Sequence, residues 1–206
     1  MSRLTIVIGS KRLSSWSLRG WLALKLSGAR FDEVVIPLDQ PSTRQRILEH
    51  APAGRVPILK DGAVTVWESL AICEYLAERS PKAGLWPEGA EARAHARVVA
   101  AEMHAGFADL RRDMPMDCPA RRPGEGQTPG ALADIARVSE IWRDCRRRFG
   151  SGGDFLFGRP GAADAMYAPV VSRFVTYDVP LDEVSAAYRE AVLALPAMRE
   201  WLAAAH

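Results

Sequence analysis

The stretch from Arg55 to Ser69 constrains the fold of this 206-residue chain more than any other part. Two short runs rich in β-branched residues lie on either side of Asp61-Gly62. An Asp-Gly pair in that setting is a strong short-range signal for a β-hairpin. Pro57 opens the first run, and because proline cannot donate to a ladder it belongs at the start of a strand or on an edge. The sequence therefore predicts an antiparallel pair of strands.

Glu68 and Ser69 end the second run and directly precede a helical pattern that starts at Leu70. The first N–H groups of a helix have no partner within the helix, and the helix dipole adds partial positive charge there. Such a helix start suits an anionic ligand. A hairpin followed by a capped helix explains the same residues without a ligand, so both interpretations stand at this point.

The residues before the hairpin follow a β-α-β order. Residues 4–8 form an apolar, β-branched run typical of a buried strand, and residues 31–36 form a second strand. Between them, apolar residues recur at the spacing of one helix face. A short helix at 43–50, anchored by Leu48, leads to the hairpin and the helix after it. The predicted order βαβαββα is that of a thioredoxin-like domain over residues 1–80.

The chain turns all-helical after a linker at 81–89 that is rich in proline and glycine. One helix face recurs from Val99 to Leu110. Residues 113–130 hold four prolines and three glycines and predict a loop with a functional role or disorder. Further helices are predicted at 135–149, 162–177, 182–195 and 196–205. The fold class is therefore an α/β domain followed by an all-α bundle domain over residues 90–206.

Composition excludes several classes of function. Apolar residues make up 48% and charged residues 25% of the chain, as in an ordinary globular protein. A net charge of +2 gives no global basic field, so nucleic acid is not an expected partner. No apolar run approaches the ~20 residues of a membrane span, and the start lacks a secretory pattern. Cys73, Cys118 and Cys145 have no metal-ligand spacing and predict small buried side chains in a reducing, cytoplasmic setting.

Val56-Pro57 and Glu68-Ser69, at this spacing and followed by residues 70–76, resemble the glutathione-binding half of the glutathione S-transferase family. The resemblance implies a cis bond before Pro57, glutathione as co-substrate, no metal, and a homodimer. It also implies that Val56 bonds the cysteinyl backbone of glutathione, while Glu68 and Ser69 hold its γ-glutamyl end. Three basic residues are candidates for the glycyl carboxylate: Arg55 first, then Lys11 and Arg12.

Ser14-Ser15-Trp16-Ser17 follows the first strand and resembles the Ser-Ser-Cys-Ser-Trp-Arg motif of the zeta class, whose members isomerise maleylacetoacetate. Trp16 stands where the zeta class has cysteine and is assigned to the glutathione-binding residues. Lowering the thiol pKa from about 8.5 by ~2 units needs ~3 kcal/mol, which one hydroxyl hydrogen bond and a helix N-terminus can supply. By resemblance Ser14 is the first choice for the catalytic hydroxyl, followed by Ser15 and Ser17. Serine is also a preferred N-cap, so capping alone is the alternative.

Residues 155–169 resemble a second mark of the family, in which a Ser or Thr caps a helix and an Asp three residues later returns the bond. Here Gly161 stands at the cap position and Asp164 at the returning position. Glycine caps a helix only a few tenths of a kcal/mol less well than serine. We expect the motif to be structural, and the sequence predicts that Gly161→Ser raises the melting temperature.

The resemblance as a whole implies a cytosolic glutathione transferase whose thiolate attacks a small hydrophobic electrophile. Met103, Phe107, Leu110 and Met114 are candidates for the wall of the second-substrate site, although the first three fit an ordinary helix core equally well. Two other functions stay open. One is a glutathione-dependent cis-trans isomerase of the maleylacetoacetate or maleylpyruvate type. The other is a non-enzymatic glutathione-binding regulator or ligand carrier on the same fold.

Overall fold

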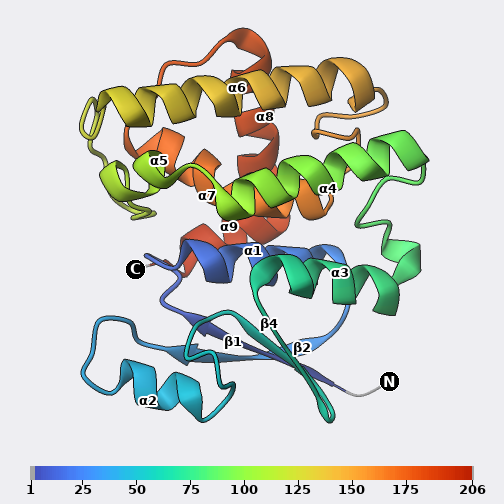
Figure 1. Ribbon diagram of the computed structural model, residues 1–206, viewed down its shortest axis with the longest axis vertical. Coiled ribbons are helices and arrows are strands. Elements are labelled where there is room, and N and C mark those ends of the chain that lie inside the picture. The colour runs from blue at the N-terminus through green and yellow to red at the C-terminus, as the bar shows by residue number, and fades with distance from the viewer. Residues whose placement is uncertain (1–2, 206) are drawn as a thin grey trace.

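The computed structural model describes residues 3–205, which form a sheet domain and a helical domain stacked on each other (Figure 1). The strands of the sheet lie in the order β2-β1-β3-β4, with β1 and β2 parallel and the other two pairs antiparallel. This confirms the predicted thioredoxin-like order. In chain order the elements are β1 (Leu4–Gly9), α1 (Ser15–Leu26), β2 (Phe31–Ile36), α2 (Thr43–Leu48), β3 (Ile58–Asp61), β4 (Val64–Trp67) and α3 (Ser69–Arg79).

The central strand β1 explains why helices cover both faces of the sheet. Successive side chains of a strand point to opposite faces. Leu4, Ile6 and Ile8 are fully buried in the main core, whereas Val7 is buried in a smaller cluster that includes Ile47 of α2. Figure 1 shows α2 on the outer face of the sheet, and α1 and α3 between the sheet and the helical domain. Ile47, and not the exposed Leu48, therefore anchors α2, which corrects the sequence expectation.

The helical domain is built around α7, which is buried along nearly its whole length. The helical domain begins after α3 with a short 3₁₀ turn. The last helix of this domain, α9, returns to pack against α1. The all-helical class predicted for this half is confirmed. Its elements are η1 (Pro81–Ala83), α4 (Ala90–Ala105), α5 (Ala108–Asp113), α6 (Pro129–Phe149), α7 (Ala162–Thr176), α8 (Glu183–Ala194) and α9 (Pro196–Ala203).

Helix α1 lies between the two domains. Eight consecutive residues, from Ser17 to Leu24, are buried, whereas a helix at a protein surface buries only one stripe. Trp21 of α1 meets Trp201 of α9 edge-on, with 5.2 Å between ring centroids. The Trp21 indole N–H also donates to Glu33 Oε1 at 2.6 Å. The helix that follows the serine motif is thus held by both halves of the chain.

The helix predicted from Val99 to Leu110 is broken in the structure, which corrects the sequence reading. Helix α4 ends at Ala105, and Phe107 has a left-handed backbone with φ 61°. The guanidinium of Arg111 donates to the carbonyl oxygens of Met103 and His104, and so satisfies acceptors that the end of a helix leaves free. The apolar spacing continues across the break because α5 packs on the same core.

The hairpin turn is shifted by one residue from the expected one. Strand β3 includes Asp61, and the two turn residues are Gly62 and Ala63. Gly62 has φ 58°, a conformation that glycine adopts without strain. Asp61 instead accepts hydrogen bonds from Tyr75 and Arg79 of α3. The aspartate therefore ties the hairpin to the helix that follows it.

The structure reverses the expected effect of Gly161→Ser. A Cβ at Gly161 would lie 2.7 Å from the carbonyl oxygen of Leu85, which already accepts the N–H of Ala162 at 2.8 Å. Relieving that overlap costs roughly 1–3 kcal/mol, more than a better cap gains. We therefore expect Gly161→Ser to lower the melting temperature. Gly89→Ser is the matched control, because Gly89 caps α4 and a Cβ there would meet only the Ala92 Cβ, at an unstrained 4.0 Å. Its replacement is expected to raise the melting temperature slightly.

Candidate active site

A pocket of about 560 Å³ opens beside the carboxyl end of β1, between the hairpin and α4. Parallel sheets commonly bind ligands at the carboxyl ends of their strands. Seven of the residues predicted for the site line it, together with apolar residues and one histidine that the sequence reading did not assign. The lining residues are Leu13, Ser14, Ser15, Trp16, Leu38, Ile47, Arg55, Val56, Pro57, Trp67, Glu68 and His104.

The serine motif forms a tight turn and the first turn of α1. The N–H of Ser14 donates to Ser10 O at 2.8 Å, which closes the turn. Ser14 is the N-cap of α1, and its Oγ accepts the N–H of Ser17 at 3.3 Å. Its hydroxyl donates to Ser17 Oγ at 2.7 Å, and Ser17 Oγ in turn accepts the N–H of Gly9 at 2.9 Å. Ser14 therefore lies at the pocket wall and Ser17 behind it.

The three serines thus differ in what their hydroxyls can reach. Ser17 is fully buried and does not line the pocket, so its hydroxyl supports Ser14 rather than meeting a ligand. Ser15 lines the pocket and is half-buried. Among the described residues, its hydroxyl has no hydrogen-bond partner within the chain. Ser14 and Ser15 are the hydroxyls that the structure brings to the pocket.

The hairpin forms the opposite wall. The Val56–Pro57 peptide bond is cis, as the resemblance implies. Arg55 is exposed at the rim, and Val56 lines the pocket just before β3. Glu68 is the N-cap of α3 with φ 70°, an uncommon backbone conformation for a residue other than glycine. Arg55, Val56 and Glu68 all line the pocket.

Ser69 lies differently from the prediction. It is the first residue of α3, but its side chain is fully buried and its hydroxyl contacts Met166 Sδ at 3.8 Å. Its hydroxyl therefore does not line the pocket. The N–H of a first helical residue has no partner within the helix, so the main chain is what Ser69 can offer to a ligand.

Trp16 lies between two guanidinium groups. The central carbon of Arg19 is 4.4 Å from the Trp16 ring centroid, and that of Arg111 is 4.8 Å away. Arg19 is buried and Arg111 is half-buried, and burial lowers the pKa of each. Among the described residues, Nε and Nη1 of Arg19 have no hydrogen-bond partner. Cation–π contact with Trp16 compensates part of that cost.

His104 of α4 completes the pocket, and the sequence reading missed it. Its ring meets Trp16 edge-on at 5.1 Å, and its Nε2 is 3.8 Å from Glu68 Oε2. Burial lowers the pKa of His104, against the raising effect of Glu68 and with help from Arg19 and Arg111. Burial of the ring therefore favours the neutral imidazole. The sequence contained one sign that His104 could belong to the site, because it follows Met103 on a helix that was expected to face the second substrate.

The predicted second-substrate wall lies in the helical core. Met103, Leu110 and Met114 are fully buried and Phe107 is 7% exposed, and none of them lines the pocket. Met103, Phe107 and Leu110 therefore occupy positions in the helix core, as the alternative to a substrate-binding role predicted. The pocket surface next to Ser14 and Ser15 is formed instead by Trp16, Leu13 and His104.

Lys11 and Arg12 are engaged away from the pocket. Lys11 Nζ pairs with Glu33 at 2.8 Å and lies over the rings of Trp21 and Trp201. Arg12 pairs with Asp117 of the helical domain. Of the three basic candidates for the glycyl carboxylate, only Arg55 lines the pocket.

Three further findings concern the residues that the structure describes. Across residues 3–205, no group of three or more His, Cys, Asp or Glu side chains is placed to hold a metal ion. Cys73, Cys118 and Cys145 are buried free thiols, as predicted, and burial raises the pKa of Cys73 and Cys145 to about 12. Within the same residues, no helix has the length and apolarity that crossing a bilayer requires.

The family models of known proteins match both halves of the chain. The model for the glutathione S-transferase N-terminal domain matches residues 13–79, and that for the C-terminal domain matches residues 92–204. The chain belongs to the glutathione S-transferase family. The N-terminal match includes the serine motif, the cis proline, the Glu68-Ser69 pair and every residue that lines the pocket except His104.

Individual relatives are more distant. A probable maleylacetoacetate isomerase from Caenorhabditis elegans is 33% identical over 110 residues, which are 53% of this chain and 51% of the relative. The matched part thus spans about half the length of such curated relatives. A theta class glutathione S-transferase from Xanthomonas axonopodis pv. citri with glutathione bound superposes with a TM-score of 0.68 at 22% identity, over 98% of both chains. A glutathione transferase homologue from Burkholderia with bound glutathione gives 0.72 at 23%, over 98% of this chain and 97% of the other. These likenesses establish the fold.

Proposed function

We propose that this protein is a glutathione transferase that binds glutathione in the pocket and activates its thiol with Ser14. The observation that carries the proposal is the joining of three features at one pocket: a cis Val56–Pro57 bond, the Glu68 cap of α3, and a serine hydroxyl at the N-terminus of α1. Val56 offers main-chain groups to the cysteinyl part of the tripeptide. Glu68 and the first N–H groups of α3 suit its γ-glutamyl end, and Arg55 its glycyl carboxylate.

The hydrogen-bond chain behind Ser14 supports thiolate formation. When the Ser14 hydroxyl turns from Ser17 toward a thiolate, Ser17 can donate to Ser14 Oγ while still accepting from Gly9 N–H. All three donors then point toward the negative sulfur, and each bond polarises the next. The proton leaves the thiol for solvent. The sulfur then forms a bond to an electrophilic carbon, and the leaving group on that carbon, such as a halide, departs with the electron pair of the bond that breaks. His104 lines the same pocket and can meet the second substrate.

The test is equilibrium binding of glutathione, followed by conjugation of a neutral nitroaryl halide. We expect binding, an ultraviolet band of bound thiolate near neutral pH, and release of halide in step with conjugate. Absence of glutathione binding overturns the proposal. Binding without turnover of any electrophile supports instead the regulator or carrier reading of the same pocket.

A second candidate is isomerisation of an acidic cis-alkene, in which glutathione adds to the double bond and then leaves. The guanidiniums of Arg19 and Arg111 favour it, because both contact the Trp16 ring and neither is ion-paired with a carboxylate among the described residues. A carboxylate on the second substrate would complement that charge. If the protein turns over maleylacetoacetate or maleylpyruvate faster than the neutral nitroaryl halide, the isomerase function is supported. If it turns over the halide faster, the isomerase function is rejected.

The proposal includes a homodimer in the cytoplasm. Val98 of α4 and Leu132 of α6 are 59% and 47% exposed, so these helices offer apolar surface to a second copy. Three free thiols suit a reducing compartment. A sedimentation mass near the 22.6 kDa of one chain contradicts the dimer.

A further inference from the structure

The turn that carries Ser14 is tied to the helical domain from its outer side. Arg12 Nε donates to Asp117 Oδ1 at 2.7 Å, and Arg12 Nη2 donates to Oδ2 at 3.1 Å. A guanidinium that meets a carboxylate with two parallel bonds fixes both position and orientation. Asp117 is 5% exposed, so solvent competes little from its side. We call this pair the Arg12–Asp117 clasp.

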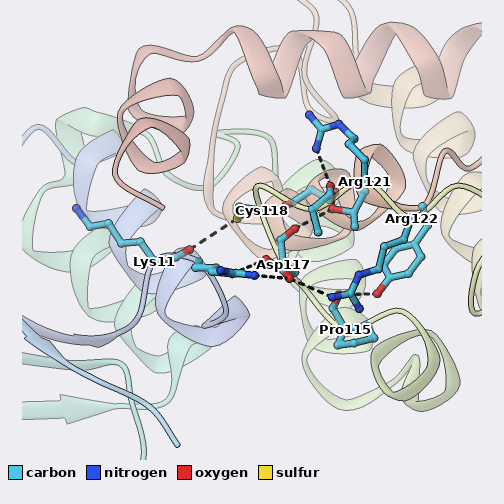
Figure 2. Close-up of polar contacts among 11 residues, drawn as sticks. Lys11, Pro115, Asp117, Cys118, Arg121 and Arg122 are labelled. Carbon is cyan, nitrogen blue, oxygen red and sulfur yellow. Dashed lines mark hydrogen bonds and ion pairs between the residues drawn. The ribbon is translucent and has the colours of Figure 1, made fainter. Parts of the chain in front are cut away.

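The main chain adds two more ties at the same turn. The N–H of Cys118 donates to Arg12 O at 3.2 Å, and the Cys118 thiol contacts Lys11 O at 3.7 Å. Figure 2 shows the Cys118 sulfur reaching across to Lys11, with Asp117 beside it. Lys11 is itself held by Glu33 and two indole rings. Two adjacent residues of the turn are therefore bound by the same segment of the helical domain.

That segment is itself rigidly held, although its composition predicted a loop. Thr176 Oγ1 donates to Asp117 O at 3.2 Å, and the Tyr177 hydroxyl donates to Pro115 O at 3.0 Å. Arg122 N–H donates to Thr176 O at 2.6 Å, and its Nη2 meets Asp117 Oδ2 at 3.2 Å (Figure 2). The end of the buried helix α7 thus sets the place of Asp117.

We propose that Asp117 is a positioning residue for thiol activation, which through Arg12 fixes the Ser10–Ser14 turn and so the direction of the Ser14 hydroxyl. The inference rests on the proposed function. Ser14 is two residues from Arg12 in a turn closed by the 2.8 Å bond from Ser14 N to Ser10 O, so a shift of Arg12 is passed to Ser14. A misplacement of about 1 Å in a reacting group can cost ~100-fold in rate. Glutathione itself is held by the hairpin wall, which the clasp does not touch.

The alternative is that the clasp only joins the two domains. Lys25 of α1 provides the matched control, because its ammonium pairs with Glu200 of α9 at 2.6 Å and so joins the same domains away from the turn. Lys25→Met therefore removes an ion pair between the two domains while leaving the Arg12–Asp117 clasp in place.

The experiment measures the pKa of bound glutathione's thiol from its ultraviolet thiolate band, together with kcat, KM for glutathione and the melting temperature. Asp117→Asn and Arg12→Gln are each expected to raise that pKa by about one unit, which is about a tenfold loss of thiolate below the pKa. We expect kcat to fall by about tenfold and KM for glutathione to stay within about twofold. Arg12→Lys, which keeps the charge but not the fork, is expected to restore part of the rate. The Lys25→Met control is expected to keep the thiol pKa and the kcat of the parent.

Three results overturn the inference. The first is an unchanged thiol pKa and kcat in both Asp117→Asn and Arg12→Gln; Arg12 is half-exposed, so its variant tests the clasp even where Asp117→Asn folds poorly. The second is a shift of equal size in Lys25→Met, which assigns the effect to the domain contact. The third is that the parent protein binds no glutathione or forms no bound thiolate. That result overturns the proposed function as well, and the measurement on the parent protein alone distinguishes it from the other two results.

Discussion

Replacement of Ser14 by alanine is expected to lower kcat by roughly 10- to 100-fold and to raise the pKa of bound glutathione's thiol by about 1–2 units. The range follows from a hydrogen bond to a charged group, which contributes ~1.5–3 kcal/mol, at 1.36 kcal/mol per unit of pKa. KM for glutathione changes little because the hairpin wall is intact. The pH profile of kcat measures the shift directly: the rise of rate with pH moves to higher pH in the variant.

Ser15→Ala and Ser17→Ala complete that test. Ser15→Ala is expected to keep the thiol pKa, because Ser15 is not part of the chain from Gly9 through Ser17 to Ser14. Ser17→Ala leaves the buried N–H of Gly9 without its acceptor, so it is expected to lower the melting temperature as well as the rate. If Ser15→Ala moves the thiol pKa while Ser14→Ala does not, the assignment of Ser14 is wrong.

Replacement of Asp164 by alanine is expected to reduce the free energy of unfolding by about 3–5 kcal/mol. The carboxylate is buried and accepts three hydrogen bonds, from Leu156 N–H at 3.2 Å, Gly161 N–H at 2.8 Å and the Tyr188 hydroxyl at 3.0 Å. Each buried donor left without an acceptor costs ~1–3 kcal/mol. Denaturant unfolding followed by circular dichroism measures the loss. A loss below about 1 kcal/mol contradicts a structural role for this carboxylate.

The same carboxylate gives stability a pH dependence whose sign can be stated. Burial raises the pKa of Asp164 from 3.8 to about 6. The folded state therefore binds this proton more tightly than the unfolded state. The stabilisation by the proton is fully present below pH 3.8 and is lost as pH rises through about 6; two units of pKa correspond to ~3 kcal/mol.

Asp164→Asn isolates this contribution, since the amide does not titrate. We expect stability of the parent to fall between pH 4 and pH 7 relative to that of Asp164→Asn. The side-chain NH₂ of the Asp164→Asn variant would face one of the N–H or O–H groups that donate to the carboxylate in the parent protein. Two donors then oppose each other, so the variant is expected to be less stable overall. Parallel pH profiles for the two proteins show that another group carries the dependence.

Residue patterns within short stretches of the sequence predicted the helices, strands and turns that depend only on neighbouring residues. The hairpin, the βαβ unit and the α6 helix follow from residue spacing, and the Val56-Pro57 and Glu68-Ser69 pairs were enough to place one wall of the pocket. The break at Phe107 escaped prediction because it depends on Arg111, whose guanidinium caps α4 from a different element. An apolar pattern that continues through a break contains no sign of the break.

The remaining site residues escaped for a related reason. His104 shares a helix turn with Met103, and only the packing of the domains decides which of the two faces the pocket. Asp117 and Arg12 are separated by 105 residues, so no sequence window contains both. A proline-rich segment such as the one around Asp117 predicts a loop correctly but not what holds it. Contacts between distant segments thus account for most of what the sequence did not reveal about the site.

The burial of α1 on every side also bears on how the protein folds. Eight successive residues from Ser17 to Leu24 are shielded partly by the sheet and partly by α7 and α9. A fragment that stopped after α3 would leave one side of this helix in water, along with the Trp21 surface that meets Trp201. The two halves, which separate domain models match, share one core. We therefore expect them to unfold together, in one cooperative transition that depends on α9.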